Sequence, residues 1–216
     1  MAELCQAAIE GVDSIMVFDK VRESLLTNRF EVSCFETKEE AVEYLNEKID
    51  NKTVGIGGSM TVLEMGLYDK IASHNTVNWH MLSYEGRSPR DVIDAANASE
   101  IYISSVNGLA ETGEIINIDG MCNRVSSLLF GHEKVYFIVG VNKLAPDYDS
   151  ALWRARNIAA PLNARRLEKN TPCAKMELKC YDCKGPDRIC CGLSVLWKKP
   201  RNGSYEVILI NEKLGY

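Results

Sequence analysis

The stretch TVGIGGSMTVLEMGLYDKI, residues 53–71, indicates the fold of this protein. Its first six residues read as a short apolar β-strand that ends in glycines, and residues 59–71 carry apolar side chains at helical spacing. A strand that gives way to a helix within a few residues is the repeating unit of sheets whose faces are covered by helices. The stretch therefore predicts an α/β fold.

The same alternation of strand and helix patterns recurs along most of the chain. Short apolar runs predict further strands, and apolar residues at helical spacing predict helices. The predicted strands are residues 30–36, 100–106, 113–119 and 134–140, and the predicted helices are residues 2–28, 37–49, 88–97, 121–131 and 148–167. Several strands are apolar on both faces, which is typical of strands with helices on both sides. We predict an open, mostly parallel sheet covered by helices.

Local signals mark several helix ends. Thr37 and Glu40 match a capping box, and Ser88 is expected to cap a helix whose first turn contains Pro89. Pro161 lies inside the last predicted helix, where a proline removes a backbone hydrogen bond and crowds the preceding turn. We expect that helix to kink or break at this residue.

The C-terminal part of the chain has a different composition from the rest. A cysteine-rich segment is followed by two strand patterns, residues 192–199 and 204–216, with Asn202 and Gly203 between them. An Asn-Gly pair between two strands favours a β-hairpin. We therefore predict a main α/β domain over residues 1–168, and a cysteine-rich loop plus hairpin over residues 169–216 that packs on it.

The composition excludes several classes of function. The 216 residues are 46% hydrophobic, which is enough for one well-buried core, and no run of eighteen apolar residues is present. The N-terminal residues are acidic and amphipathic, unlike a secretory signal. A net charge of −5 opposes nonspecific binding to nucleic acid. We expect a cytoplasmic protein with no membrane insertion and no nucleic-acid partner, whose eight cysteines are reduced.

The glycine-rich loop at residues 55–59 is the first candidate site. A strand that runs through glycines into a helix leaves unpaired backbone N–H groups, which favour a bound anion such as a phosphate or a carboxylate. The candidate ligand-binding residues are Gly57, Gly58, Ser59, Met60 and Thr61. The loop is not a Walker A motif. In the alternative interpretation, the glycines only permit a tight turn.

Polar side chains around the ends of later strands form two further candidate groups. Open α/β sheets bind their ligands at the carboxyl ends of their strands, so Glu111 and Asp119 are candidate catalytic carboxylates, and Asn117 and Asn123 are candidate ligand-binding residues. The alternative is that these residues are ordinary turn and surface residues.

The loop GVNKLAPD, residues 140–147, again follows a strand directly. Lys143 is a candidate catalytic or anion-binding cation at the same cleft, and Asn142 is a candidate hydrogen-bonding residue. The alternative is that Lys143 is simply a solvated surface lysine.

Together these loops resemble a known family. The segments GIGGSMTVLEMGL, ETGEIINIDG and ALWRARNIAAPLNARRL are similar to the LUD domain of the lactate-utilisation proteins, over about residues 10–216. The resemblance implies a fold like that of the sugar-phosphate isomerase and CoA-transferase superfamily. It also implies a role beside iron-sulfur partner proteins that oxidise lactate to pyruvate. It implies no agreed catalytic residue, so the assignments above rest on position in the sheet.

Five of the eight cysteines lie in CAKMELKCYDCKGPDRICC, residues 173–191. A Cys-x-x-Cys pair with flanking cysteines suits tetrahedral zinc or an iron-sulfur cluster, and the ferredoxin spacing is absent. The expected ligands are Cys173, Cys180, Cys183 and Cys190. Cys190 is preferred to Cys191, which is expected to point into the core, although the sequence leaves the choice open. The family resemblance favours a 4Fe-4S cluster; zinc and ordinary reduced thiols are the alternatives.

Two functions follow as hypotheses. In the first, the protein binds a small anionic metabolite and works as an oxidoreductase component of lactate or hydroxy-acid metabolism, with iron-sulfur redox partner proteins. In the second, it is a non-catalytic partner or regulatory subunit with a structural zinc site. The sequence does not decide whether the domain is catalytic, which substrate it binds, or whether it forms a homo-oligomer.

Overall fold

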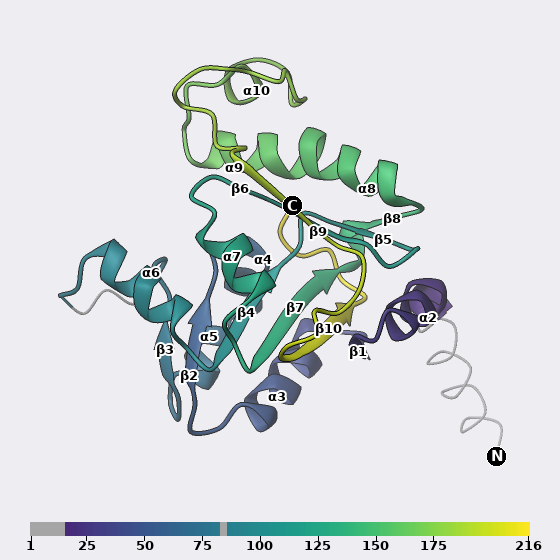
Figure 1. The fold of residues 1–216 in the computed structure, drawn as a ribbon, viewed down its shortest axis with the longest axis vertical. Coiled ribbons are helices and arrows are strands. Elements are labelled where there is room, and N and C mark those ends of the chain that lie inside the picture. Colours follow the sequence, from purple (N-terminus) through teal and green to yellow (C-terminus); the bar gives the residue numbers. More distant parts are fainter. Residues whose placement is uncertain (1–15, 83–85) are drawn as a thin grey trace.

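The centre of the computed structural model, which describes residues 16–82 and 86–216, is a six-stranded sheet in the order β1-β10-β7-β4-β2-β3. Every neighbouring pair of its strands is parallel. The strands are β1 (Glu31–Phe35), β2 (Thr53–Ile56), β3 (Thr76–Asn78), β4 (Ile101–Ser105), β7 (Lys134–Gly140) and β10 (Ser204–Ile210). Figure 1 shows helices packed around this sheet. The predicted α/β class and open parallel sheet are confirmed.

Hydrophobic cores lie on both faces of this sheet, because successive side chains of a strand point to opposite faces. The helices α3, α4 and α5 bury their apolar side chains in one core, and α2, α6 and α7 contribute to the other. The helices of this part of the chain are η1 (Met16–Phe18), α2 (Asp19–Thr27), α3 (Lys38–Lys48), α4 (Met60–Met65), α5 (Leu67–Ile71), α6 (Pro89–Asn97) and α7 (Asn123–Leu129). A single helix was predicted over residues 2–28. Its first part, residues 2–15, lies outside the described residues.

The expected helix caps are present. The Thr37 hydroxyl accepts a hydrogen bond from the Glu40 backbone N–H, and the Glu40 carboxylate accepts one from the Thr37 N–H. Ser88 forms the same kind of capping box before α6. The helix predicted at residues 59–71 is divided into α4 and α5, because Gly66 adopts a left-handed φ of 68° that interrupts the helix.

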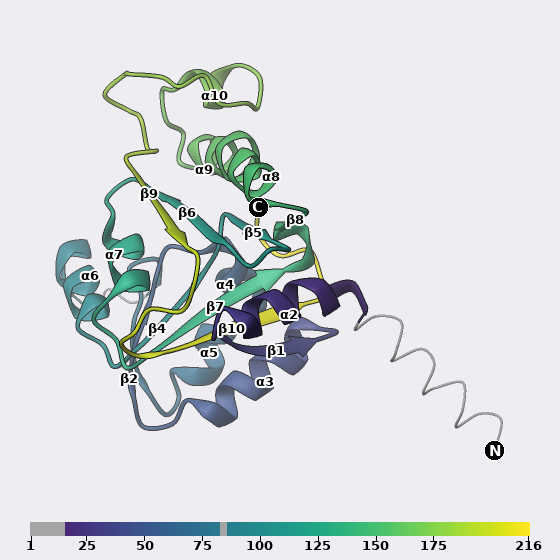
Figure 2. The same cartoon turned by 45° about the vertical axis from the view of Figure 1, so that its right-hand side comes forward.

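A second sheet lies beside the first, in the order β8-β5-β6-β9. Its strands are β5 (Gly108–Ala110), β6 (Ile115–Asp119), β8 (Leu144–Ala145) and β9 (Gly192–Leu196), and the 3-10 turn η2 (Val141–Lys143) precedes β8. A long helical segment crosses this sheet, as Figure 2 shows. It consists of α8 (Tyr148–Arg154), the π-helical turn η3 (Ala155–Ala159) and α9 (Ala160–Arg166), and the short α10 (Pro172–Lys175) lies beyond it.

The predicted C-terminal β-hairpin is wrong. Strand β9 pairs with β6 in the second sheet, whereas β10 pairs in parallel with β1 and β7 at the centre of the main sheet. The physical reason is burial, since six of the seven residues of β10 are buried and its side chains enter both cores. Each sheet thus contains strands from both sides of residue 168.

The long helix does not break at Pro161. It instead widens into the π-helical turn η3 just before this residue, which accommodates the missing backbone N–H and the bulk of the ring. The turn presents Arg156 and Asn157 to the cysteine segment: the Asn157 side chain accepts a hydrogen bond of 3.0 Å from the Cys180 backbone N–H. The predicted irregularity is therefore present as a bulge.

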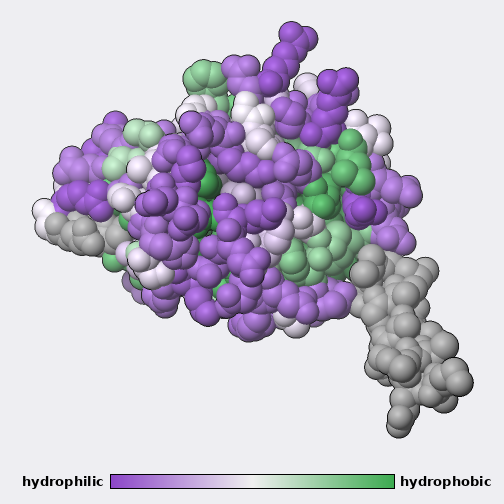
Figure 3. Space-filling model, turned by 90° about the horizontal axis from the view of Figure 1, so that it is seen from below, coloured by the Kyte–Doolittle hydropathy of each residue, from purple (hydrophilic) through white to green (hydrophobic). Residues whose placement is uncertain are grey.

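The face shown in Figure 3, which views the molecule from below, is mainly hydrophilic, with a larger hydrophobic area to the right. Within the described ranges, no helix combines the length and the apolar character needed to cross a membrane.

Candidate functional site

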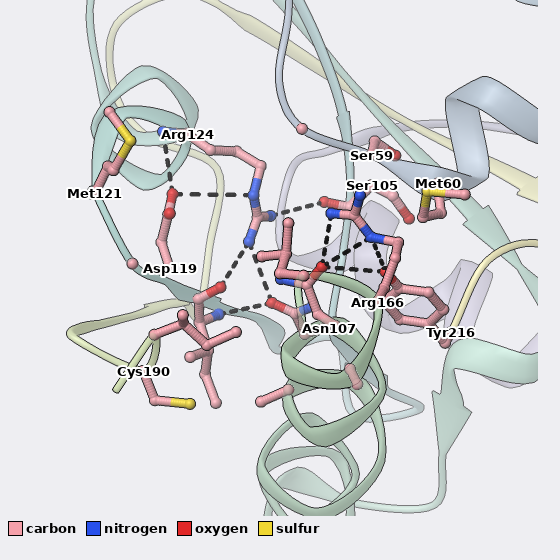
Figure 4. Close-up of a pocket in the computed structure, with 18 of the residues that line it drawn as sticks. Ser59, Met60, Ser105, Asn107, Asp119, Met121, Arg124, Arg166, Cys190 and Tyr216 are labelled. Carbon is pink, nitrogen blue, oxygen red and sulfur yellow. Dashed lines mark hydrogen bonds and ion pairs between the residues drawn. The ribbon is translucent and has the colours of Figure 1, made fainter. Parts of the chain in front are cut away.

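A cavity of about 530 Å³ lies at the carboxyl ends of the central strands, under α9. Segments far apart in the sequence form its wall: the loop between β2 and α4, the ends of β4 and β6, the start of α7, the C-terminal half of the long helix, part of the cysteine loop, and Tyr216. Figure 4 shows Asp119 and Arg124 on one side of this cavity and Arg166 with Tyr216 on the other. Its position agrees with the rule that open α/β sheets bind ligands at this edge.

Two serines at the end of β4, both with buried hydroxyl groups, are among the residues that line the cavity. Ser104 is fully buried and Ser105 is 7% exposed, and neither hydroxyl has a hydrogen-bond partner within the part of the chain that the structure describes. Most buried polar side chains in proteins are hydrogen-bonded, so two adjacent exceptions call for a partner. Gly57 keeps this corner open, because a Cβ there would lie 3.0 Å from the Ser104 oxygen.

Arg124 forms one side of the cavity, and its guanidinium is held by several acceptors. It donates to the Ile118 carbonyl at 2.7 Å, to the Asn107 side chain at 3.2 Å, and to the side chain of Asn117. A Cβ on Gly57 would approach the Arg124 Cγ to 2.9 Å, so the glycine permits the close packing of this arginine. The pKa of Arg124 is lowered by burial, an effect that Asp119 opposes.

Asp119 is the last residue of β6, and its side chain reaches the start of α7. Its Oδ2 atom accepts hydrogen bonds from the backbone N–H groups of Arg124 and Val125, both at 3.1 Å, and lies 3.9 Å from the Arg124 Nε atom. One carboxylate oxygen is therefore used to hold the helix end. The interaction of a carboxylate with free N–H groups at a helix start is favourable.

Lys143 is a cavity-lining lysine that is only 2% exposed. Its Nζ donates a hydrogen bond of 2.7 Å to the backbone oxygen of Tyr216, the last residue of the given sequence. Burial and, to a smaller extent, the nearby charges of Arg154 and Arg124 lower the pKa of Lys143 to about 7, while Glu64 opposes the shift. Both protonation states of this amine are therefore populated near neutral pH.

The last residues of the chain pass over this lysine. Asn142 accepts a hydrogen bond from the Leu214 N–H and donates one to the Gly215 carbonyl. The Tyr216 hydroxyl lies 2.7 Å from the Arg166 Nε atom, which donates to it. Asn142, predicted to bind a ligand, forms hydrogen bonds with this C-terminal segment.

The predicted catalytic and ligand-binding residues divide into three groups: those that line the cavity, those just behind it, and Glu111. Those that line the cavity are Gly58, Ser59, Met60, Thr61, Asp119, Asn123 and Lys143. Gly57, Asn117 and Asn142 lie just behind it and position other groups.

Glu111 is the exception among the predicted site residues. It pairs with Lys20 at 2.6 Å, in the turn after β5, and does not line the cavity. This turn joins β5 to β6 at the far end of β6 from Asp119, so the predicted catalytic role of Glu111 has no geometric support.

Several important residues are missing from the sequence-based prediction. They are Ser104, Ser105, Arg124, Arg166, His80 and Tyr216. The two serines could have been recognised from the sequence. In the segment EIYISSV, two hydroxyl residues lie near the end of an otherwise largely apolar strand pattern. The others come from distant segments and carry no local signal.

The cavity is cationic although the whole chain carries a net charge of −5. Its ionisable lining residues, apart from His80 and Tyr216, are Arg124, Lys143, Arg166, Lys169 and Arg188 against Asp119, Asp187 and Cys190. A cleft lined by one sign of charge concentrates ligands of the opposite sign. The arrangement suits a small anion.

A second, much smaller cavity of about 20 Å³ is lined by all four predicted metal ligands, Cys173, Cys180, Cys183 and Cys190. Burial and, to a smaller extent, the charges of Cys180 and Cys173 raise the pKa of the Cys190 thiol to about 11. Cys190 also lines the large cavity, so the two cavities share a wall.

The thiols do not form a metal site as they stand. Over the described ranges, no three or more Cys, His, Asp or Glu side chains are grouped so that they could hold a metal ion. Cys191, expected to point into the core, is exposed and donates to the Arg188 carbonyl, because it lies at the outer start of the edge strand β9. The donor chemistry nevertheless suits a soft metal, and the four cysteines all line one small cavity.

Comparison with known proteins identifies the family. The model of the LUD domain family matches residues 18–210, most of the chain. The chain belongs to the LUD domain family. A search of curated proteins found no match to this LUD domain protein.

A solved structure supports the fold. A DUF162 family protein from Deinococcus radiodurans is 10% identical, and the match covers 91% of this chain and 98% of that chain, with a TM-score of 0.50. The eIF2B beta protein from Chaetomium thermophilum is 15% identical, covering 69% of this chain and 50% of that chain, with a TM-score of 0.33. At such low identity the first likeness bears on the fold alone.

Proposed function

We propose that this LUD domain protein binds a small anionic metabolite, a hydroxy acid or its oxidised counterpart, in the large cavity. The observation that carries the proposal is the cationic lining of this cavity, which also includes Ser104 and Ser105, whose buried hydroxyls have no hydrogen-bond partner within the described structure. A carboxylate would be attracted by Arg166 and Lys143, and either serine could donate a hydrogen bond to it. The family's connection with lactate utilisation favours this ligand class over phosphate esters and thioesters.

The cavity also contains groups that can move a proton. Lys143, with its pKa lowered by burial to about 7, takes up or releases a proton near neutral pH. Asp119 has one carboxylate oxygen that is not used at the start of α7. We propose Lys143 as the acid-base group for hydroxy-acid chemistry and Asp119 as the residue that positions Arg124.

The double variant Ser104→Ala, Ser105→Ala tests the binding site. We expect L-lactate, pyruvate or both to bind the native protein in calorimetric titrations, and we expect the double variant to bind at least tenfold more weakly. Each lost hydrogen bond to a charged ligand removes about 1.5–3 kcal/mol. Ser99→Ala is the matched control, because Ser99 is equally buried but bonds to the Ala95 carbonyl outside the cavity. Equal affinity in the native protein and the double variant would contradict the proposal.

We further propose that Cys173, Cys180, Cys183 and Cys190 bind a metal, a 4Fe-4S cluster with electron transfer to partner proteins, or zinc as the alternative. Four thiols around one small cavity support this donor set. When bound, a cluster would supply one-electron chemistry and zinc a structural clip. The cysteine loop would have to contract around either.

Anaerobic purification with metal analysis and a visible spectrum tests this second proposal. Cys183→Ala should lose the metal, while Cys122→Ala and Cys191→Ala should retain it, since neither control residue lines the small cavity. Brown, iron-containing protein supports the redox role. A colourless zinc protein that binds no small anion instead favours a non-catalytic partner subunit. Absence of metal from the native protein would refute the site.

A further inference from the structure

We propose that Arg156 is a positioning residue of the four-cysteine metal site, where its guanidinium donates to the Cys180 sulfur and so strengthens metal binding. This inference rests on the metal-binding function proposed above and names a residue outside the four cysteines on which that function depends. Three features carry it: a direct contact between guanidinium and sulfur, a helical turn that places the arginine, and a loop backbone that is already held at the cysteines.

The first feature is the contact with one predicted ligand. The Arg156 Nη2 atom donates a hydrogen bond of 3.4 Å to the Cys180 Sγ atom, and the Asp182 backbone N–H donates another of 3.4 Å to the same sulfur. A hydrogen bond is stronger when its donor and its acceptor carry opposite charges. A metal-bound thiolate therefore gains more from Arg156 than from a neutral donor in its place.

The second feature is the π-helical turn η3, which contains both Arg156 and Asn157. The Asn157 side chain accepts a hydrogen bond of 3.0 Å from the Cys180 backbone N–H, next to the contact between Arg156 and the sulfur. Two consecutive residues of the helix thus hold the backbone and the side chain of one cysteine. Single π-helical turns occur frequently at functional sites.

The third feature is the backbone of the cysteine loop. Arg188 donates to the Cys183 carbonyl at 2.7 Å and to the Cys190 carbonyl at 2.9 Å. Asp182 joins the two arginines, because its Oδ1 atom lies 3.5 Å from Arg156 Nη2 and 3.2 Å from Arg188 Nη1. This network ties three of the four predicted ligands to one pair of guanidinium groups.

The charges of these groups also favour a bound metal. Four thiolates carry more negative charge than a zinc ion or an oxidised 4Fe-4S cluster balances, so positive charge beside them stabilises the loaded site. Arg156 is the guanidinium that contacts a sulfur directly, whereas the hydrogen bonds of Arg188 to the cysteines go to carbonyls and accept no charge from a sulfur. We therefore expect Arg156 to act on the metal and Arg188 to act on the shape of the loop.

Titration of the metal-free, full-length protein with Co²⁺ and with Zn²⁺ tests the proposal. Arg156→Met should bind both ions roughly 10–100-fold more weakly than the native protein, the range typical of a lost hydrogen-bond partner of a metal ligand. Arg156→Lys keeps a charged donor and should recover most of the affinity. At saturation with Co²⁺, the thiolate-to-cobalt absorption band should shift in Arg156→Met, because the sulfur has lost a charged donor.

Arg165→Met is the matched control. Arg165 lies on the same helical segment and is exposed, and its hydrogen bonds in the described structure tie the helix to the carbonyls of Ala174 and Met176 in the cysteine segment. It should bind both ions like the native protein, with an unshifted band. If the native protein carries a 4Fe-4S cluster, Arg156→Met should lower its reduction potential and Arg165→Met should not.

The outcomes separate this inference from the metal site itself. Native affinity and a native cobalt spectrum in Arg156→Met would refute the role of Arg156 and leave the metal site standing. Equal weakening in Arg156→Met and Arg165→Met would refute it as well, since the loss would then come from loosening the loop. If the native protein binds neither ion and carries no cluster, the metal site and the role of Arg156 both fail.

Discussion

The variant Lys143→Met should be more stable than the native protein below pH 7, and this advantage should shrink as the pH rises. Folding buries Lys143 and lowers its pKa from 10.5 to about 7. Below pH 7 the lysine is charged in both the folded and the unfolded state, so the folded protein carries the full cost of a buried charge. Between pH 7 and 10.5 the folded state releases the proton first, and this cost falls.

The size of the effect follows from the same two pKa values. Between pH 6 and pH 9 the difference in unfolding free energy between Lys143→Met and the native protein should fall by about 3 kcal/mol. Urea denaturation at both pH values measures it. Lys134→Met is the control with the opposite sign, because it removes ion pairs with Glu31 and the buried Glu206 and should destabilise the protein. A pH-independent difference for Lys143→Met would show that Lys143 titrates like an ordinary lysine.

Gly55→Ala should destabilise the protein by about 3 kcal/mol. A Cβ at this position would lie 2.2 Å from the Ala96 carbonyl oxygen and 2.9 Å from the Tyr102 ring, so α6 would have to move away from β2. The contact is with backbone, which cannot turn aside as a flexible side chain can. The displacement would also reach the loop after β2, which carries Ser59 and Thr61 into the cavity.

Gly185→Ala is the matched control for this substitution. Nothing lies within 4 Å of a Cβ at Gly185, so we expect its unfolding free energy to stay within about 0.5 kcal/mol of the native value. Chemical denaturation of both variants gives the comparison. Similar stabilities for Gly55→Ala and Gly185→Ala would mean that α6 does not pack against β2 as closely as described.

Local patterns predicted most elements of the fold, but not the short β3, β5, β8 and α10 or the order of the strands in the sheets. The capping boxes at Thr37 and Ser88, the glycine loop before α4 and the apolar strands were readable, because each depends on residues a few positions apart. The hairpin was misread for the opposite reason. An Asn-Gly turn is a local signal, but the burial of β10 on both faces is satisfied only between β1 and β7.

In the candidate site too, some residues were predicted from the sequence and others were found only in the structure. The polar residues after the strands were predicted to meet at one edge of the sheet, and Ser59, Asp119 and Lys143 do line one cavity. Arg166 and Tyr216 were not predicted there, because they reach the cavity from the long helix and the end of the chain. Nothing near them in the sequence indicates which distant segment they face.

By itself, the sequence determined that this chain is an α/β protein of the LUD domain family with a glycine-rich loop and a four-cysteine segment. Only the tertiary structure decided that β10 completes the centre of the sheet, that Ser104 and Ser105 are left without partners among the described residues, and that Cys190 lines two cavities. The reason is physical. Periodicity and capping are properties of neighbouring residues, whereas strand order, burial and charge environment depend on contacts between segments that the sequence keeps apart.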